Sequence, residues 1–202
     1  PASVNHVYTQ GGFTFNVLAS ATDEDGTVHQ NPLLVPSWSG TDSVFRYAPT
    51  SGAYLSQFAN GLDDQVKILT GPDGNLYVSG MASGNVGRYA PDGTFIDFFV
   101  AANAGGLVSP VGMAFGLDGH LYVADYAGGV VLRYNGNTGA FIDQFVSPGE
   151  GGIAVPLGIT FGPDGNLYVA NRGPDSVLRY DGATGVFIDA FVAAGPHAPA
   201  SP

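Results

Sequence analysis

A segment of 14 residues occurs four times in this chain, and no other feature restricts the fold as strongly. Three copies are closely similar: LYVSGMASGNVGRY from residue 76, LYVADYAGGVVLRY from 121 and LYVANRGPDSVLRY from 167. A weaker copy, LVPSWSGTDSVFRY, begins at Leu34. The copies align without a gap. Their closing Arg-Tyr pairs start at 46, 88, 133 and 179, so the spacing is 42, then 45, then 46 residues. Repeats of this length are typical of propellers and other repeat architectures.

Each repeat reads as a set of short strands joined by tight turns. The apolar runs are β-branched and aromatic, which excludes a solenoid of helix pairs. Gly-Pro-Asp-Gly at 71–74 and 162–165 has the composition of a hairpin turn. In the last repeat we expect strands at 157–161, 167–170, 177–180 and 186–191.

Four antiparallel strands in about 45 residues predict a propeller blade. The expected fold class is therefore all-β, a β-propeller of four-stranded antiparallel blades. We place four blades at residues 12–60, 65–101, 111–147 and 157–192.

The two ends of the chain lie outside these blades. Residues 1–11 form an N-terminal extension in which Val4–Thr9 is expected to be extended, and 193–202 is a tail rich in Pro and Ala. Residues 192–202 align with 100–110, so the chain stops where a fifth innermost strand would begin. Two alternatives stay open: the four blades close alone, or another segment or chain completes the ring.

The composition excludes several classes of function. The formal net charge is −11, from 17 acidic residues against six Lys and Arg, which argues against nucleic acid and anionic membranes as partners. No apolar run approaches the roughly 18–20 residues of a membrane span, so membrane insertion is not expected. Because the chain has no cysteine, disulfides, thiolate metal sites and a cysteine nucleophile are excluded.

The stretches FGLDGHLYVADYAGGVVLRYNGNTGAFIDQFV (115–146) and FGPDGNLYVANRGPDSVLRYDGATGVFIDAFV (161–192) carry a family resemblance. The chain resembles NHL-repeat β-propellers, especially secreted bacterial repeat proteins, strongly over 65–192 and weakly over 12–60. The resemblance implies a secreted or cell-surface location. It implies no single activity, because such propellers include lyases, protein-binding modules and members without an assigned activity.

Polar residues that repeat in every blade are expected to be structural. We expect Arg179 to be a diagonal neighbour of Asp189 across the outer hairpin, in a register that places Tyr180 opposite Val186. Such an ion pair would stabilise the hairpin by about 0.2–1 kcal/mol. The aspartates of the hairpin turns are expected to bond to their own backbone.

Residues that differ between repeats are better candidates for binding. They lie in the loop between the second and third strands, where rigid scaffolds commonly carry their binding residues. The gap-free alignment puts Trp38 in one column with Asp125 and Asn171, and the candidate cluster is Trp38, Asp125, Tyr126, Asn171 and Arg172. An exposed Trp and Tyr beside Asp and Asn would suit a sugar ring, and two side-chain oxygens would suit Ca²⁺. The alternative is an ordinary variable loop.

Two further aspartates, Asp23 and Asp25, are weak candidates for a cation site. The segment Asp23–Thr27 begins like a calcium loop but lacks the later acidic ligands of an EF-hand, so a solvated acidic turn is the other interpretation. The four histidines share no repeat column, and no nucleophile elbow is present, which disfavours an enzyme.

These observations favour a non-catalytic, extracellular binding or structural module. Its partner would be another protein or itself, as a homo-oligomer or filament, with Val4–Thr9 or the blade edges supplying the contact. One alternative is a metal-dependent propeller lyase or lactonase whose ion is held by Asp125 and Asn171. Another is a propeller that binds glycans through Trp38 and Tyr126. No cofactor is expected other than Ca²⁺.

Overall fold

The computed structural model describes residues 4–10, 13–19, 32–36 and 43–193, and nearly all of their regular structure is β-strand. Three sheets each contain four antiparallel strands in sequence order, and they correspond to blades 2, 3 and 4 of the prediction. Blade 2 consists of β6 (Gln65–Thr70), β7 (Leu76–Gly80), β8 (Asn85–Tyr89) and β9 (Phe95–Val100). Blade 3 consists of β10 (Pro110–Phe115), β11 (Leu121–Asp125), β12 (Val130–Tyr134) and β13 (Phe141–Val146). Blade 4 consists of β14 (Val155–Phe161), β15 (Leu167–Arg172), β16 (Ser176–Tyr180) and β17 (Phe187–Val192).

Blade 1 differs from the prediction. Within the described residues its sheet has three strands, β3 (Leu33–Pro36), β4 (Ser43–Tyr47) and β5 (Tyr54–Asn60). The segment expected as its first strand, β2 (Phe13–Ala19), pairs instead with β1 (Val4–Gln10) in a separate hairpin. β1 and β2 are two residues apart in sequence, so pairing them closes a much shorter loop than pairing β2 with β3 would.

The register of blade 1 corrects the gap-free alignment. In blades 2 to 4 the leucine that opens the repeated segment lies opposite its closing tyrosine, as Leu121 does opposite Tyr134. In blade 1 it is Leu33, not Leu34, that lies opposite Tyr47. Blade 1 therefore has one more residue between these strands.

The hairpin turns follow the expected chemistry. In the turn of blade 2, Gly74 has φ 79° and donates its N–H to the Gly71 carbonyl at 3.0 Å, while Asp73 accepts the N–H of Asn75 at 3.1 Å. The same bonds recur in blades 3 and 4. The turn aspartates are thus engaged by backbone, as predicted from their sequence context.

The core lies between blades. Alternate side chains of a strand point to opposite faces of the sheet. We call the face toward the preceding blade the N-side face and the face toward the following blade the C-side face. On the C-side face of blade 3, Tyr122, Val131 and Phe145 are buried against Leu167 and Tyr180 on the N-side face of blade 4. Equivalent clusters join blade 2 to blade 3 and blade 1 to blade 2, so burial of facing sheets holds the blades in order.

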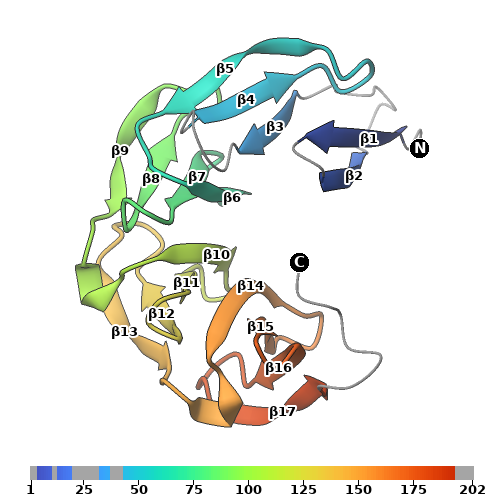
Figure 1. The fold of residues 1–202 in the computed structure, drawn as a ribbon. Helices are drawn as coiled ribbons and strands as arrows, with labels where there is room; N and C mark the ends of the chain where they lie inside the picture. Colours follow the sequence, from blue (N-terminus) through green and yellow to red (C-terminus); the bar gives the residue numbers. More distant parts are fainter. Residues whose placement is uncertain (1–3, 11–12, 20–31, 37–42, 194–202) are drawn as a thin grey trace.

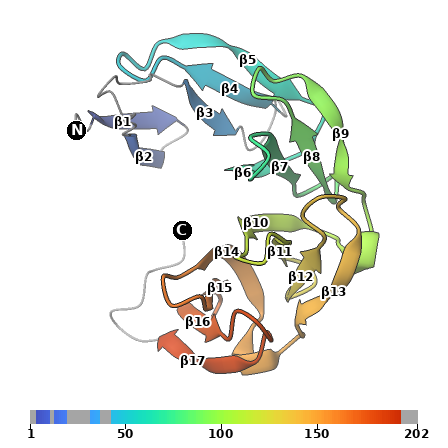
Figure 2. The same ribbon diagram turned by 180° about the vertical axis from the view of Figure 1, so that it is seen from behind.

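The blades lie along an open arc (Figures 1 and 2). The first strands β6, β10 and β14 lie on the inner side of the arc, and the fourth strands β5, β9, β13 and β17 lie on the outside. Blade 4 and the β1–β2 hairpin stand at opposite ends of the arc with a gap between them. Among the described residues, no buried cluster joins blade 4 to blade 1. The described residues of the four blades therefore form an open arc.

Candidate functional site

The predicted site lies on the loops that leave the second strand of each blade. Four of its members, Asp125, Tyr126, Asn171 and Arg172, belong to the described residues. Trp38, Asp23 and Asp25 lie outside them.

Asp125, the last residue of β11, is fully buried. One carboxylate oxygen accepts the backbone N–H of Val108 at 2.9 Å, and the other accepts those of Ser109 at 2.9 Å and Gly128 at 3.2 Å. Val108 and Ser109 belong to the connector from blade 2 to blade 3. The Asp125 carboxylate thus fastens that connector to the loop of blade 3.

Asn171 has the equivalent role in blade 4. Its side-chain oxygen accepts the N–H groups of Ala154 and Val155, each at 3.0 Å, and its amide nitrogen donates to the Gly152 carbonyl at 3.0 Å. The side chain is almost fully buried. Asp125 and Asn171 therefore share a column because each clamps the connector that enters its own blade.

Blade 2 has a glycine at the position of this clamp. The aligned position is Gly80, and backbone hydrogen bonds join the loop to the shorter connector that precedes the blade. Met81 donates its N–H to the Asp64 carbonyl at 2.9 Å, and Ala82 donates to that of Asp63 at 3.2 Å. Prediction from the sequence missed the clamp. The sequence does contain a signal for it. The long connectors precede the two blades with Asp125 or Asn171 at this position, whereas the short connector precedes the blade with Gly80.

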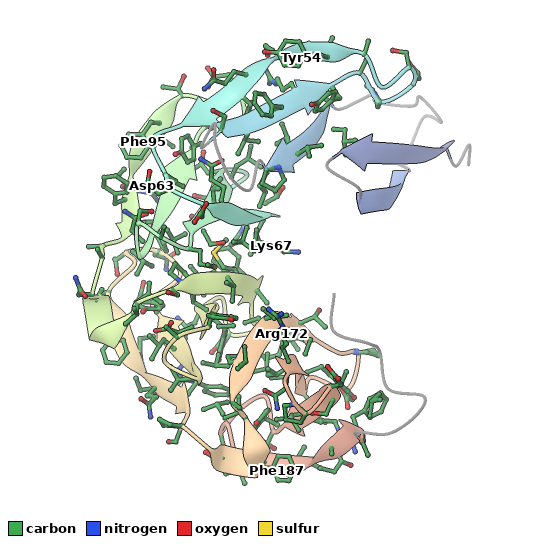
Figure 3. All side chains as sticks on the ribbon, in the orientation of Figure 1. Tyr54, Asp63, Lys67, Phe95, Arg172 and Phe187 are labelled. Carbon is green, nitrogen blue, oxygen red and sulfur yellow. The ribbon has the colours of Figure 1, made fainter. Side chains whose placement is uncertain are left out.

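The residues one position later in the sequence, Tyr126 and Arg172, differ from each other in burial. Tyr126 is half-buried and packs against the cluster between blades 3 and 4, while its backbone N–H donates to the Ser109 carbonyl at 2.9 Å. Arg172 is exposed at the end of β15. In Figure 3, Arg172 and Lys67 of β6 both lie toward the inner, open side of the arc. Of these four side chains, Arg172 is the only exposed one and is therefore the most accessible to a ligand.

The repeated arginines form a network at the outer strands. In blade 4, Nε of Arg179 donates to Oδ1 of Asp189 at 3.1 Å and a terminal nitrogen donates to Oδ2 at 2.6 Å. The guanidinium also lies 3.8 Å from the turn carboxylate of Asp164, which accepts the hydroxyl of Tyr168 at 2.9 Å. Blades 2 and 3 repeat the arrangement. The predicted pairing is present, with a corrected register: Arg179 lies directly opposite Asp189, and Tyr180 lies opposite Phe187.

The pKa shifts in this network follow from its bonds. Hydrogen bonds from Asn166 and Tyr168 lower the pKa of Asp164 below its ordinary value. Burial raises the pKa of Tyr122 to about 12, which keeps this hydroxyl protonated as a donor to Asp118. The network thus holds its charges in fixed framework bonds in every complete blade.

No three His, Asp or Glu side chains within the described ranges come together as a metal site. Nor do those ranges contain a helix of the length and hydrophobicity needed to cross a bilayer.

Comparison with known proteins shows the fold. The chain aligns with virginiamycin B lyase from Staphylococcus aureus at TM-score 0.57 and 17% identity, over 88% of this chain and 66% of the lyase. A putative gluconolactonase aligns at 0.63 and 21%, over 85% and 68%. The WD40 β-propeller domain of Doa1 aligns at 0.63 and 13%, over 84% and 52%. The fold is that of a β-propeller.

The likeness extends no further than the fold, because these identities are all below 25%. No family model and no curated protein matches the sequence, so the NHL resemblance remains a proposal. The chain spans only 66% of the lyase chain and 52% of the Doa1 chain.

Proposed function

We propose that this chain is a non-catalytic β-propeller module that binds protein, at a cell surface or outside the cell. The observation that carries the proposal is a band of exposed apolar side chains along the fourth strands, here called the rim band. Its members are Tyr54, Leu55, Phe95, Ile96, Phe98, Phe141, Ile142, Val186 and Ile188. Exposed apolar side chains that recur in every blade favour contact with another protein.

The backbone of the rim supports the same function. Strands β5, β9, β13 and β17 each end their sheet, so each has one edge without a partner strand in its sheet. An extended segment can add to such an edge through main-chain hydrogen bonds, with alternate side chains supplying specificity. The expected partner is therefore an extended, partly apolar segment of another protein.

The predicted polar ligands support a framework role. The side chains of Asp125 and Asn171 both accept hydrogen bonds from the backbone of the connectors between blades. Buried groups whose hydrogen bonds are already made in this way serve the scaffold.

Selection of phage-displayed random peptides against the folded protein tests the proposal. Peptides that bind should lose on the order of tenfold in affinity for Ile142→Lys, which places a charge in the rim band without entering the core. Arg172→Ala, on the inner side of the arc, should bind them unchanged and is the control. Failure to select any peptide, or equal loss in both variants, would refute rim binding.

The neighbouring folds favour one second candidate, a metal-dependent lyase or lactonase, since proteins named as a lyase and a putative gluconolactonase are among the similar structures. In this candidate Asp125 and Asn171 would hold a divalent ion. Elemental analysis of protein purified without chelator should then find about one ion per chain, absent in Asp125→Ala. A metal-free protein would remove this candidate.

A further inference from the structure

The arginine of blade 1 lacks the acid that its counterparts have. In each of the other three blades, the arginine of the third strand donates two hydrogen bonds to the aspartate directly opposite it on the fourth strand. These pairs are Arg88–Asp97, Arg133–Asp143 and Arg179–Asp189. In blade 1 the residue opposite Arg46 is Ser56, whose hydroxyl carries no charge. A carboxylate is therefore missing from a position where the other blades supply one.

Arg46 has only partial substitutes for that carboxylate. A terminal nitrogen donates to the carbonyl of Pro91, in the outer turn of blade 2, at 3.3 Å. The guanidinium stacks 4.7 Å from the ring centroid of Phe58, and its buried Nε has no hydrogen-bond partner. The carboxylate of Asp92 accepts the N–H of Thr94 at 2.8 Å, and no described carboxylate forms an ion pair with Arg46. This half-buried cation therefore retains donors for an incoming carboxylate.

The seam between blades 1 and 2 is hollowed next to this arginine. A cavity of about 270 Å³ lies in the seam, and the Phe58 ring on which Arg46 stacks forms part of its wall. The other lining residues are Gln57 and Ala59 of β5 and Tyr89, Gly93 and Phe95 of blade 2. Gln57 and Phe95 are exposed, so the cavity opens at the rim, where Figure 3 shows Phe95 on the outside of the arc. The seam thus offers hydrogen-bond donors beside an apolar wall.

We infer that Arg46 binds a glutamate, flanked by apolar residues, in an extended protein segment that pairs with the free edge of β5. This contact rests on the proposed binding of protein at the rim and specifies the chemistry of the partner. A residue of the added strand opposite Ser56 would lie on the same sheet face as Arg46. Two strand spacings, about 10 Å, would separate it from Arg46, and the long side chains of arginine and glutamate span that distance together. The small side chain of Ser56 leaves the path open, whereas Asp143 occupies it in blade 3.

The test is NMR of the arginine Nε–H groups of the folded protein during titration with sodium acetate to about 100 mM, with sodium chloride as the ionic-strength reference. Acetate should shift the Arg46 resonance, whereas the three arginines that already donate to aspartates should not respond. The peptide acetyl-Val-Glu-Val-amide should reach the same shift at about tenfold lower concentration, because its main chain adds hydrogen bonds to β5. Its glutamine counterpart should leave the resonance in place.

Three variants make the result specific. Ser56→Asp places an internal acid opposite Arg46 and should abolish the response to acetate and to the peptide. Asp143→Ser removes the acid from blade 3 and should make Arg133 respond to acetate. Ser51→Asp adds the same charge at an exposed position in the outer turn of blade 1 and should leave the response of Arg46 unchanged. Circular dichroism and thermal midpoints confirm that each variant is folded.

Three results would overturn the inference: an Arg46 resonance that acetate leaves in place, a Ser56→Asp variant that responds like the wild-type protein, or a glutamate peptide that binds no better than acetate. The last result would leave Arg46 as a site for small free carboxylates. Failure here is distinguishable from failure of the proposed rim binding. The peptide selection reports on blade 3 through Ile142, whereas this titration reports on blade 1 through Arg46.

Discussion

Blades 3 and 4 carry almost the same residues in the same register, yet they differ in how far they are buried. The third strands read VVLRY and SVLRY, and the fourth read FIDQFV and FIDAFV. Blade 3 has a neighbour on both faces, whereas the described residues cover blade 4 on one. A blade therefore derives its stability largely from its neighbours, as in other repeat proteins. The same side chain can then contribute differently to the free energy of unfolding in blades 3 and 4.

The largest effect should come from one pair of phenylalanines. Phe145 packs edge-on against Tyr122 at a centroid distance of 4.8 Å, and Phe191 packs against Tyr168 in the same way at 5.0 Å. Phe145→Ala should lower the free energy of unfolding by about 3–5 kcal/mol, because it leaves a cavity between two blades. Phe191→Ala should cost about 1 kcal/mol, because solvent already reaches the ring. Urea unfolding of both variants at low protein concentration measures the difference. Equal losses would show that blade 4 is covered under those conditions.

The next prediction concerns the two clamps. Asp125→Ala should cost about 2–4 kcal/mol, since it leaves the buried N–H groups of the connector without acceptors. Asp125→Asn should cost about 1 kcal/mol or less, because Asn171 already performs this task in blade 4 with an amide. Thermal unfolding of the two variants checks the order. If the alanine and asparagine variants were equally stable, the hydrogen bonds would not be what holds the connector.

These clamps also mark the limit of prediction from the sequence. The repeat was enough to predict blades, hairpin turns and the pairing of Arg179 with Asp189, because periodicity and turn chemistry are local. The sequence could not show whether Asp125 binds a ligand or holds the connector, because the answer depends on where the backbone of the connector lies. It also assigned β2 to blade 1, because an alternating segment shows strand character without showing its partner. The exposure of Phe191 depends on a neighbouring blade, which no local pattern encodes.

The buried tyrosine of blade 3 predicts a loss of stability in alkali. Burial raises the pKa of Tyr122 to about 12, above the ordinary value of 10.0 that applies to the unfolded chain. Below the unfolded pKa this tyrosine contributes its full stability. Above it the unfolded state loses its proton first, so stability falls as pH rises from about 10 through about 12. Urea midpoints across this range should fall less steeply for Tyr122→Phe. An unchanged slope in that variant would assign the loss to other groups.

The smallest effect should come from the other end blade, where the outer network is incomplete. Arg46 lies opposite Ser56, in the place where blade 3 sets Arg133 opposite Asp143. Its guanidinium stacks 4.7 Å from the centroid of Phe58, and its buried Nε has no hydrogen-bond partner. Ser56→Asp should supply that acceptor and raise the free energy of unfolding by about 0.2–1 kcal/mol, with the gain shrinking in high salt. Asp143→Ser is the reverse change in blade 3 and should cost a similar amount. If the stability gained with Ser56→Asp equals the stability lost with Asp143→Ser, the energy of this Arg–Asp pair depends only on the two paired strands and not on the neighbouring blades. In that case only the apolar faces, and not the ion pairs, distinguish an end blade from an interior one.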